Sequence, residues 1–213
     1  MKRKLRVLVA CEESQAVTIA FRNRGHEAYS SDLQECSGGH PERHIQGDAT
    51  AILDDGWDLL IAHPPCTYLS NAGAIHLYPK GVLNEERYQM GLEGRELFMK
   101  FYSCNIKKKA VENPRPSRIY ALPQYTQLIQ PFQFGDPFMK GTLLWLVNLP
   151  PLMPTNDLGT GEPMGKHANG NGWGSSGGKQ RQKNRSKTFP GIAEAMAAQW
   201  GDGEYPDFTL SYK

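Results

Sequence analysis

Residues 59–71 read LLIAHPPCTYLSN, so that a short apolar run ends in two prolines, a cysteine and a polar loop. The segment from Trp57 to Ala62 predicts a buried strand, because it is apolar and is bounded by polar and turn residues. Pro64 and Pro65 cannot continue a central strand, so the chain is expected to leave the sheet there. Cys66 therefore follows the carboxyl end of a strand, which is where open α/β sheets place their chemistry.

A second segment repeats this design at residues 109–114, which read KAVENP. Its short strand ends in the carboxylate of Glu112, and Pro114 then stops the strand. Two strand ends that offer a thiol and a carboxylate predict one active site. The alternative is that Cys66 is merely a small buried residue and that Glu112 is an acid in a surface loop.

The order of elements predicts a parallel, doubly wound α/β fold. A strand at Leu5–Ala10 precedes a helix that runs through Phe21 with Ser14 as its N-cap, and a strand at His26–Ser31 follows. Asp32 ends that strand, and a polar loop leads to Asp48. Three further elements are expected: a helix from Asn84 to about Ile106, a strand from Thr142 to Val147 and a helix from Gly191 to Trp200.

The composition is typical of a water-soluble globular protein. Of the 213 residues 39% are hydrophobic, the formal net charge is +2, and no apolar run approaches the roughly 20 residues that span a membrane. The four cysteines form no C-x-x-C pair and are interpreted as reduced thiols. The apolar run behind the basic start Met1–Lys4 is too short for a signal peptide, so the cytoplasm is the expected compartment.

Five fragments, in order along nearly the whole chain, resemble the motifs of the DNA cytosine-C5 methyltransferases. They are Pro64-Pro65-Cys66 with Ser70 (the nucleophile motif), Val111-Glu112-Asn113-Pro114 (the Glu-Asn-Val element), Phe134-Gly135-Asp136-Pro137 (the Tyr-Gly-Val-Pro segment), Asp32 with Gly47-Asp48 (acidic groups for the cofactor) and Pro190-Gly191 (the closing motif). The resemblance is closer to the short members found in bacteriophage genomes, which lack a large target-recognition domain.

This resemblance implies a Rossmann-like methyltransferase fold, with a mostly parallel sheet and helices on both faces, that uses S-adenosyl-L-methionine. It implies that Cys66 is the nucleophile and that Glu112 stabilises the charge on the cytosine ring. It also implies cofactor contacts from Ala10, Ser14, Asp32, Asp48, Pro64 and Thr188. A location in the cytoplasm of a bacterium or a phage-infected host follows from the same resemblance.

The chain departs from the family pattern in several places. The glycine-rich first loop reads Ala10-Cys11-Glu12-Glu13-Ser14, and Thr67 replaces the glutamine that usually follows the cysteine. Only Lys140 remains of the cations in the Gln-x-Arg-x-Arg segment. We therefore expect a catalytic and cofactor-binding core at 1–149, a reduced target-recognition insert at 150–187, and a helix and tail at 188–213 that complete the core.

Residues 165–187 are rich in lysine, arginine and glycine, contain no acidic residue and include Trp173. Such a segment is typical of an arm that contacts phosphates and stacks a base, although a solvated surface loop has the same composition. The expected DNA contacts are Arg115, Lys140, Trp173, Lys179, Arg181 and Arg185. The DNA is either a duplex with a flipped base or a single strand, because stacked cytosine is out of reach.

Other interpretations remain open at this point. Cys36, His40 and His44 have a spacing that could suggest zinc, but a fourth ligand is missing, so no metal is expected. Methylation of an amino group usually places an aromatic residue where Cys66 stands. A non-catalytic nucleic-acid-binding protein on a degenerate scaffold, or an enzyme that uses another electrophile or target atom, would also fit. The target sequence and the oligomeric state are not predicted.

Overall fold

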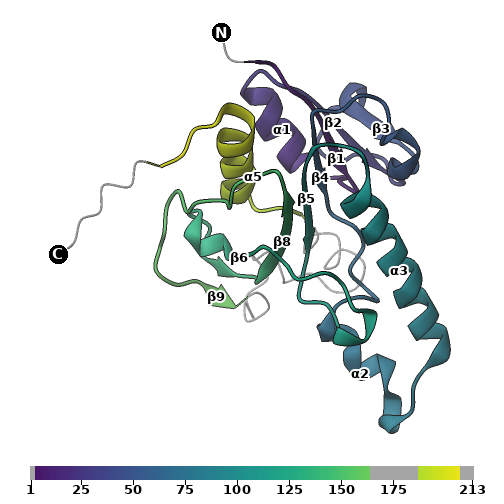
Figure 1. Cartoon of the computed structure of the whole chain (residues 1–213). Helices are drawn as coiled ribbons and strands as arrows, with labels where there is room; N and C mark the ends of the chain where they lie inside the picture. Colours follow the sequence, from purple (N-terminus) through teal and green to yellow (C-terminus); the bar gives the residue numbers. More distant parts are fainter. Residues whose placement is uncertain (1–2, 164–186, 207–213) are drawn as a thin grey trace.

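A computed structural model describes residues 3–163 and 187–206 of the chain. Its central sheet has seven strands in the order β3-β2-β1-β4-β5-β8-β6 (Figure 1). Strands β3, β2, β1, β4 and β5 run parallel to one another, whereas β8 runs antiparallel to both β5 and β6. This arrangement confirms the predicted Rossmann-like, mostly parallel α/β fold.

The strands of this sheet are β1 (Arg6–Ala10), β2 (Glu27–Asp32), β3 (His44–Gln46), β4 (Leu59–Ala62), β5 (Lys108–Asn113), β6 (Gln127–Ile129) and β8 (Thr142–Val147). A separate pair is formed by β7 (Phe138–Met139) and β9 (Glu162–Pro163). The helices are α1 (Ala16–Asn23), α2 (Ala74–Leu77), α3 (Glu85–Ser103) and α5 (Pro190–Met196), with a π-helical turn η7 (Ala197–Asp202). The single-turn 3₁₀ helices are η1 (Pro41–Arg43), η2 (Ala49–Ile52), η3 (Asn71–Gly73), η4 (Pro79–Gly81), η5 (Arg118–Tyr120) and η6 (Pro131–Gln133).

Helices cover both faces of the sheet because alternate strand residues point to opposite sides. Val7 and Val9 of β1 pack in one apolar cluster together with residues of α1 and α5. Leu8 and Ala10 of the same strand belong to a second cluster, which includes Phe98 and Phe101 of α3. Figure 1 shows α1 and α5 on one side of the strands and α3 on the other. The predicted two-sided burial of the sheet is therefore confirmed.

The C-terminal helix differs from the helix that was expected at Gly191–Trp200. It begins at Pro190 and changes at Ala197 into the π-helical turn η7. Ion pairs from Arg24, which follows α1, hold this turn: its Nη1 lies 2.7 Å from Asp202 and 2.8 Å from Glu204. The last described segment is thereby fixed to the first helix of the fold.

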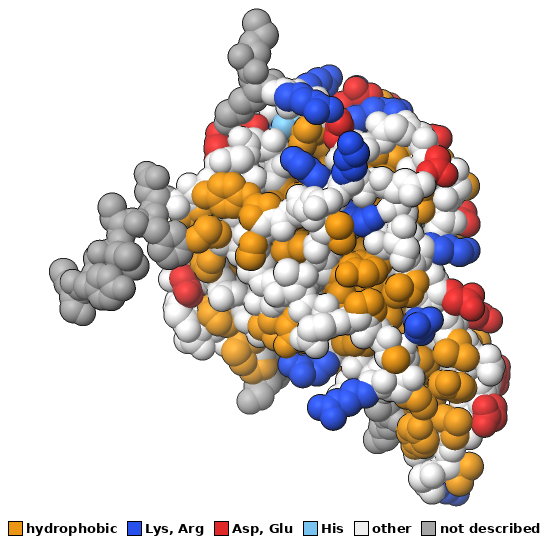
Figure 2. Space-filling view, viewed as in Figure 1, with side chains coloured by type: hydrophobic (Ala, Val, Ile, Leu, Met, Phe, Trp, Pro, Cys, Tyr) orange, Lys and Arg blue, Asp and Glu red, His pale blue; other side chains and the backbone are white. Residues whose placement is uncertain are grey.

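The long helix α3 begins as predicted, because the Asn84 side chain accepts a hydrogen bond from the Arg87 N–H at 3.0 Å. It ends at Ser103, slightly before the expected Ile106. The segment between residue 71 and this helix contains η3, α2 and η4. Figure 2 shows hydrophobic side chains gathered over this projecting end, where Tyr78 and Val82 are exposed. Among the described residues, no helix has the length and apolar character needed to cross a membrane.

Candidate active site

Four neighbouring strands end at one edge of the sheet and bring distant residues together. Ala10 at the end of β1 is paired with Ser31 of β2 and with Ala62 of β4. Ala62 is in turn paired with Val111 of β5. The residues that follow these positions, among them His63 and Glu112, therefore lie along one edge, as expected for the chemistry of an open α/β sheet.

The loops that follow β4 and β5 are bonded to each other. The Asn113 side chain donates to the Pro64 carbonyl at 3.1 Å. Further out, the Asn71 N–H donates to the Arg115 carbonyl at 2.8 Å, and the Ser117 N–H donates to the Leu69 carbonyl at 2.7 Å. The Pro-Pro-Cys and Glu-Asn-Pro segments are thus joined along their length, which explains why an asparagine follows the acid.

Cys66 lies between these contacts, two residues after Pro64. It is half-buried, and its carbonyl accepts a hydrogen bond from the Ser70 N–H at 2.9 Å, which closes a tight turn. Ser70 also forms an isolated bridge with Pro116 in the loop that follows β5. The thiol is therefore carried by a turn that is fixed to the Glu112 loop, in a partly solvent-accessible position.

Glu112 forms a close pair with His63, a residue that the sequence did not single out. The Nδ1 atom of His63 lies 3.2 Å from Glu112 Oε2, and the two side chains are 8% and 17% exposed. Burial acts to raise the pKa of Glu112, but the hydrogen bond from His63 and the charges of Lys140 and His63 outweigh it and lower the pKa. The signal available in the sequence was a histidine at a strand end, directly before two prolines.

Glu12, in the glycine-free first loop, is almost completely buried and caps helix α1. Its carboxylate accepts hydrogen bonds from the Val17 N–H at 2.7 Å, the Thr18 N–H at 3.2 Å and the Thr18 hydroxyl at 2.8 Å. Burial raises the pKa of Glu12, against the charge of His63 and these hydrogen bonds. The prediction that Ser14 caps this helix was wrong, because Gln15 is the N-cap residue and the Glu12 carboxylate takes the capping contacts.

Glu12 also limits which ligands can bind at the N-terminus of helix α1. In dinucleotide-binding folds the N-terminus of the first helix receives a phosphate group. Here a carboxylate already accepts from N–H groups of that helix, so the same position is closed to a phosphate. Asp32 and Asp48 add negative charge nearby. The described contacts therefore give this edge of the sheet an acidic character and leave these two N–H groups of α1 already bonded.

The first loop keeps left-handed backbone conformations without glycine. Cys11 has φ 59° and Gln15 has φ 58°, in a region that non-glycine residues seldom adopt. Burial together with the charges of Asp32 and Asp48 raises the pKa of the Cys11 thiol to about 12, so both acids lie near this loop. Locally, Asp32 accepts from the Gln34 N–H, and the exposed Asp48 caps η2 through the Thr50 N–H at 2.8 Å. The loop thus forms two left-handed turns without glycine at either position.

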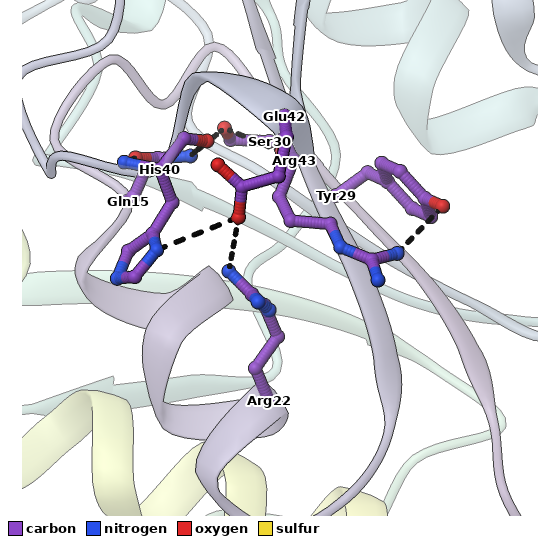
Figure 3. A network of polar contacts seen from close by, with 7 residues as sticks. All are labelled: Gln15, Arg22, Tyr29, Ser30, His40, Glu42 and Arg43. Atoms are coloured by element: carbon purple, nitrogen blue, oxygen red, sulfur yellow. Dashed lines mark hydrogen bonds and ion pairs between the residues drawn. The ribbon is translucent and has the colours of Figure 1, made fainter.

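Figure 3 shows how the loop after β2 is held against this first loop. The fully buried Gln15 side chain donates to Ser30 Oγ at 3.2 Å and to the His40 carbonyl at 2.9 Å, and accepts from the His40 N–H at 3.0 Å. The Ser37 N–H donates to the Glu13 carbonyl. His44 contacts Ser30 Oγ and the Gln34 carbonyl, and within residues 3–163 and 187–206 no group of three side chains could hold a metal.

Replacing Gln15 with alanine is expected to lower the free energy of unfolding by about 2–3 kcal/mol, because the buried Ser30 and the backbone of the half-buried His40 lose their hydrogen bonds to its side chain. Urea denaturation followed by circular dichroism measures the change. Arg22→Ala is the control in the same network, since its ion pair with the exposed Glu42 is long, at 3.4 Å, and is screened by solvent, so its loss is expected to change the stability far less. Equal losses in the two variants would contradict the role given to Gln15.

The remaining residues predicted to contact DNA or the cofactor differ in their exposure, and some lie outside the described residues. Arg115 is exposed in the loop after β5, whereas Lys140 is half-buried, with its Nζ 5.9 Å from the centre of the Phe189 ring and its charge acting on Glu112. Thr188 is half-buried directly before Phe189. Trp173, Lys179, Arg181 and Arg185, and with them most of the expected insert at 150–187, lie outside the described residues.

Two surface hollows lie away from this edge. Both are lined by Pro150 and Tyr205, and one of them, of about 410 Å³, also contacts Leu5 and Lys108, close to the amino ends of β1 and β5. Neither hollow includes Cys66 or Glu112. The hollows are therefore separate from the candidate site.

No protein-family model matches the sequence, and no curated protein is significantly similar to it. Similar solved structures include a protein described as a DNA modification methyltransferase encoded within an E. coli prophage (14% identity, 72% of this chain and 52% of that chain, TM-score 0.44). They also include the S. pombe Dnmt2 methyltransferase (12% identity, 70% and 51%, TM-score 0.44) and the Entamoeba histolytica methyltransferase EhMeth (12% identity, 73% and 58%, TM-score 0.46). The chain spans about half the length of these proteins.

Proposed function

We propose that this protein is an S-adenosyl-L-methionine-dependent methyltransferase that transfers a methyl group to C5 of cytosine in DNA. One observation carries the proposal: the Pro-Pro-Cys loop after β4 and the Glu-Asn-Pro loop after β5 are hydrogen-bonded together at the carboxyl edge of the sheet. That arrangement supports a site in which the Cys66 thiol and the Glu112 carboxylate act on one ligand, as addition to a pyrimidine ring needs.

In the proposed reaction the Cys66 thiolate adds to C6 of cytosine, because C5 alone is a poor nucleophile. The Sγ–C6 bond forms as the C5–C6 double bond opens, and the ring becomes an enamine that can be methylated at C5. Glu112, beside N3 and the exocyclic amine, stabilises the charge that develops on the ring. Loss of the C5 proton to a base then expels the thiolate and restores the aromatic ring.

The acids Glu12, Asp32 and Asp48 at this edge of the sheet support S-adenosyl-L-methionine as the methyl donor, since this molecule has a positive sulfonium and no phosphate. Ala10, Ser14, Asp32, Asp48, Pro64 and Thr188 are the residues proposed to hold it. The cofactor supplies the electrophilic methyl group. The Glu12 carboxylate at the N-terminus of α1 agrees with such a ligand and argues against a dinucleotide.

DNA is the proposed substrate, and cytosine must reach Cys66 from a flipped or single-stranded position. Exposed Arg115 and the half-buried Lys140 are proposed to contact it, together with Trp173, Lys179, Arg181 and Arg185. The short phage-encoded members of the family remain the proposed group, with the cytoplasm as the proposed compartment.

DNA that contains 5-fluorocytosine tests the proposal. Fluorine replaces the hydrogen at C5, so no C5 proton can be lost and a C5 enzyme should remain covalently attached after methyl transfer. Intact mass spectrometry would then show a species with the mass of the protein plus methylated DNA. Cys66→Ala is expected to abolish the adduct. Cys104→Ala is the control, because this half-buried thiol at the end of α3 donates to the Phe101 carbonyl. Full methylation by Cys66→Ala, or no binding of S-adenosyl-L-methionine in calorimetry with DNA present, would contradict the proposal.

A further inference from the structure

In the pair formed by His63 and Glu112, only one of the two ring nitrogens of His63 has a hydrogen-bond partner among the described residues. The side chain of His63 is only 8% exposed, its Nδ1 atom faces Glu112, and its Nε2 atom is buried without a hydrogen-bond partner among the described residues. A buried nitrogen left in this state costs about 1–3 kcal/mol, so its retention calls for an explanation. Packing alone would be served better by an apolar side chain.

The charges around the imidazole come from three other elements. Glu112 on β5 contacts Nδ1, and the charge of the imidazole acts to lower the pKa of Glu12, in the loop after β1. Lys140, from the segment after β7, acts on Glu112. Glu12 is engaged by three donors of α1, whereas Glu112 is the acid that forms a direct contact with the ring. The imidazole is thus placed to exchange a proton with Glu112 in particular.

We propose that His63 is a positioning residue that holds Glu112 in place and shares a single proton with it, so that the two side chains act as one acid. This inference rests on the proposed function. When the Sγ–C6 bond forms, electron density moves onto N3, and the shared proton passes from the pair to N3. The pair is left as neutral imidazole and carboxylate. When the thiolate is expelled, N3 returns the proton to the pair.

The first test measures the titration of Glu112 and does not require enzymatic activity. The carboxyl carbon of Glu112, labelled with ¹³C, is titrated by NMR in wild type, His63→Ala and His63→Asn. Without the histidine, burial remains and the stabilising donor is lost, so the Glu112 midpoint should rise by at least about one pH unit in His63→Ala. His63→Asn keeps a donor near the Nδ1 position and should fall between the two. Equal midpoints in wild type and His63→Ala would overturn the inference.

The second test measures single-turnover methyl transfer from pH 5.5 to 9. His63→Ala is expected to lose about 100-fold in rate, and His63→Asn about 10-fold, since asparagine positions Glu112 but cannot hold the proton. The pH at which the rate declines on the alkaline side should differ between wild type and His63→Asn, because Glu112 alone holds the proton in the variant. The exposed His76 of α2 gives the control His76→Ala, which should behave like wild type.

The outcomes separate the two proposals. A wild-type protein that neither methylates DNA nor forms the 5-fluorocytosine adduct contradicts the proposed function, and the Glu112 titration still decides whether the pair shares a proton. A wild-type protein that methylates normally, with an unchanged rate and pH profile in His63→Ala and His63→Asn, overturns the inference alone. Circular dichroism identifies a variant that fails to fold, and His63→Asn, which preserves the size and one donor, is then the deciding variant.

Discussion

Glu112→Gln is expected to lower the rate of methyl transfer by about 10²–10⁴-fold while the affinity for S-adenosyl-L-methionine stays within about twofold. The amide is the same size as the carboxylate and can still contact His63, so the local fold should survive. It cannot take up or release a proton, and it carries no charge to balance the changes on the cytosine ring. Single-turnover kinetics with cytosine-containing DNA and calorimetry with the cofactor measure the two quantities separately.

The matched control for this variant is Glu93→Gln, an exposed glutamate on helix α3. It should leave both quantities unchanged. A Glu112→Gln protein that methylates at the wild-type rate would remove the carboxylate from the mechanism. A variant that loses cofactor binding to the same extent as activity would show that Glu112 contributes to the cofactor pocket and not to the ring chemistry.

Local sequence patterns were sufficient to predict the positions of Cys66 and Glu112. A buried apolar run followed by proline fixes a strand end whatever the rest of the chain does, and the two strands β4 and β5 proved to be neighbours. Asn84 as a helix cap is equally local, since its partner, Arg87, is three residues away. Features of this kind depend on neighbouring residues, which the sequence contains directly.

The contacts of Glu12 and His63 could not be predicted in the same way. Ser14 is a residue type that often caps helices. Here the backbone at Gln15 is left-handed, and the more distant Glu12 accepts the hydrogen bond from the helix N-terminus instead. His63 meets Glu112 across 49 residues of sequence, so its role depends on the strand order. Charged side chains at a strand end acquire their function from partners that only the folded sheet supplies.

The second large effect is expected for a substitution of Gly191, near the start of helix α5. A hydrogen bond from this residue links the helix to the segment that leads to Lys140. The Gly191 N–H donates to Asp136 Oδ2 at 2.9 Å, and a methyl group added here would overlap the backbone carbonyl oxygen of Phe134. Because that obstacle is main chain, it cannot rotate away. Gly191→Ala is therefore expected to lower the free energy of unfolding by about 3 kcal/mol or more, despite the better helix propensity of alanine.

Gly141→Ala separates this steric effect from the general consequences of adding a methyl group. Gly141 is exposed, and its added methyl group would meet only the Gln130 side chain at 3.5 Å, an ordinary contact, so a change within about 0.5 kcal/mol is expected. Urea denaturation measures both variants. Phe189, next to α5, lies against Phe138 with ring centres 5.6 Å apart and faces Lys140. A displaced α5 should therefore also reduce the influence of Lys140 on Glu112, and a Gly191→Ala protein of wild-type stability would show that the two segments are not rigidly coupled.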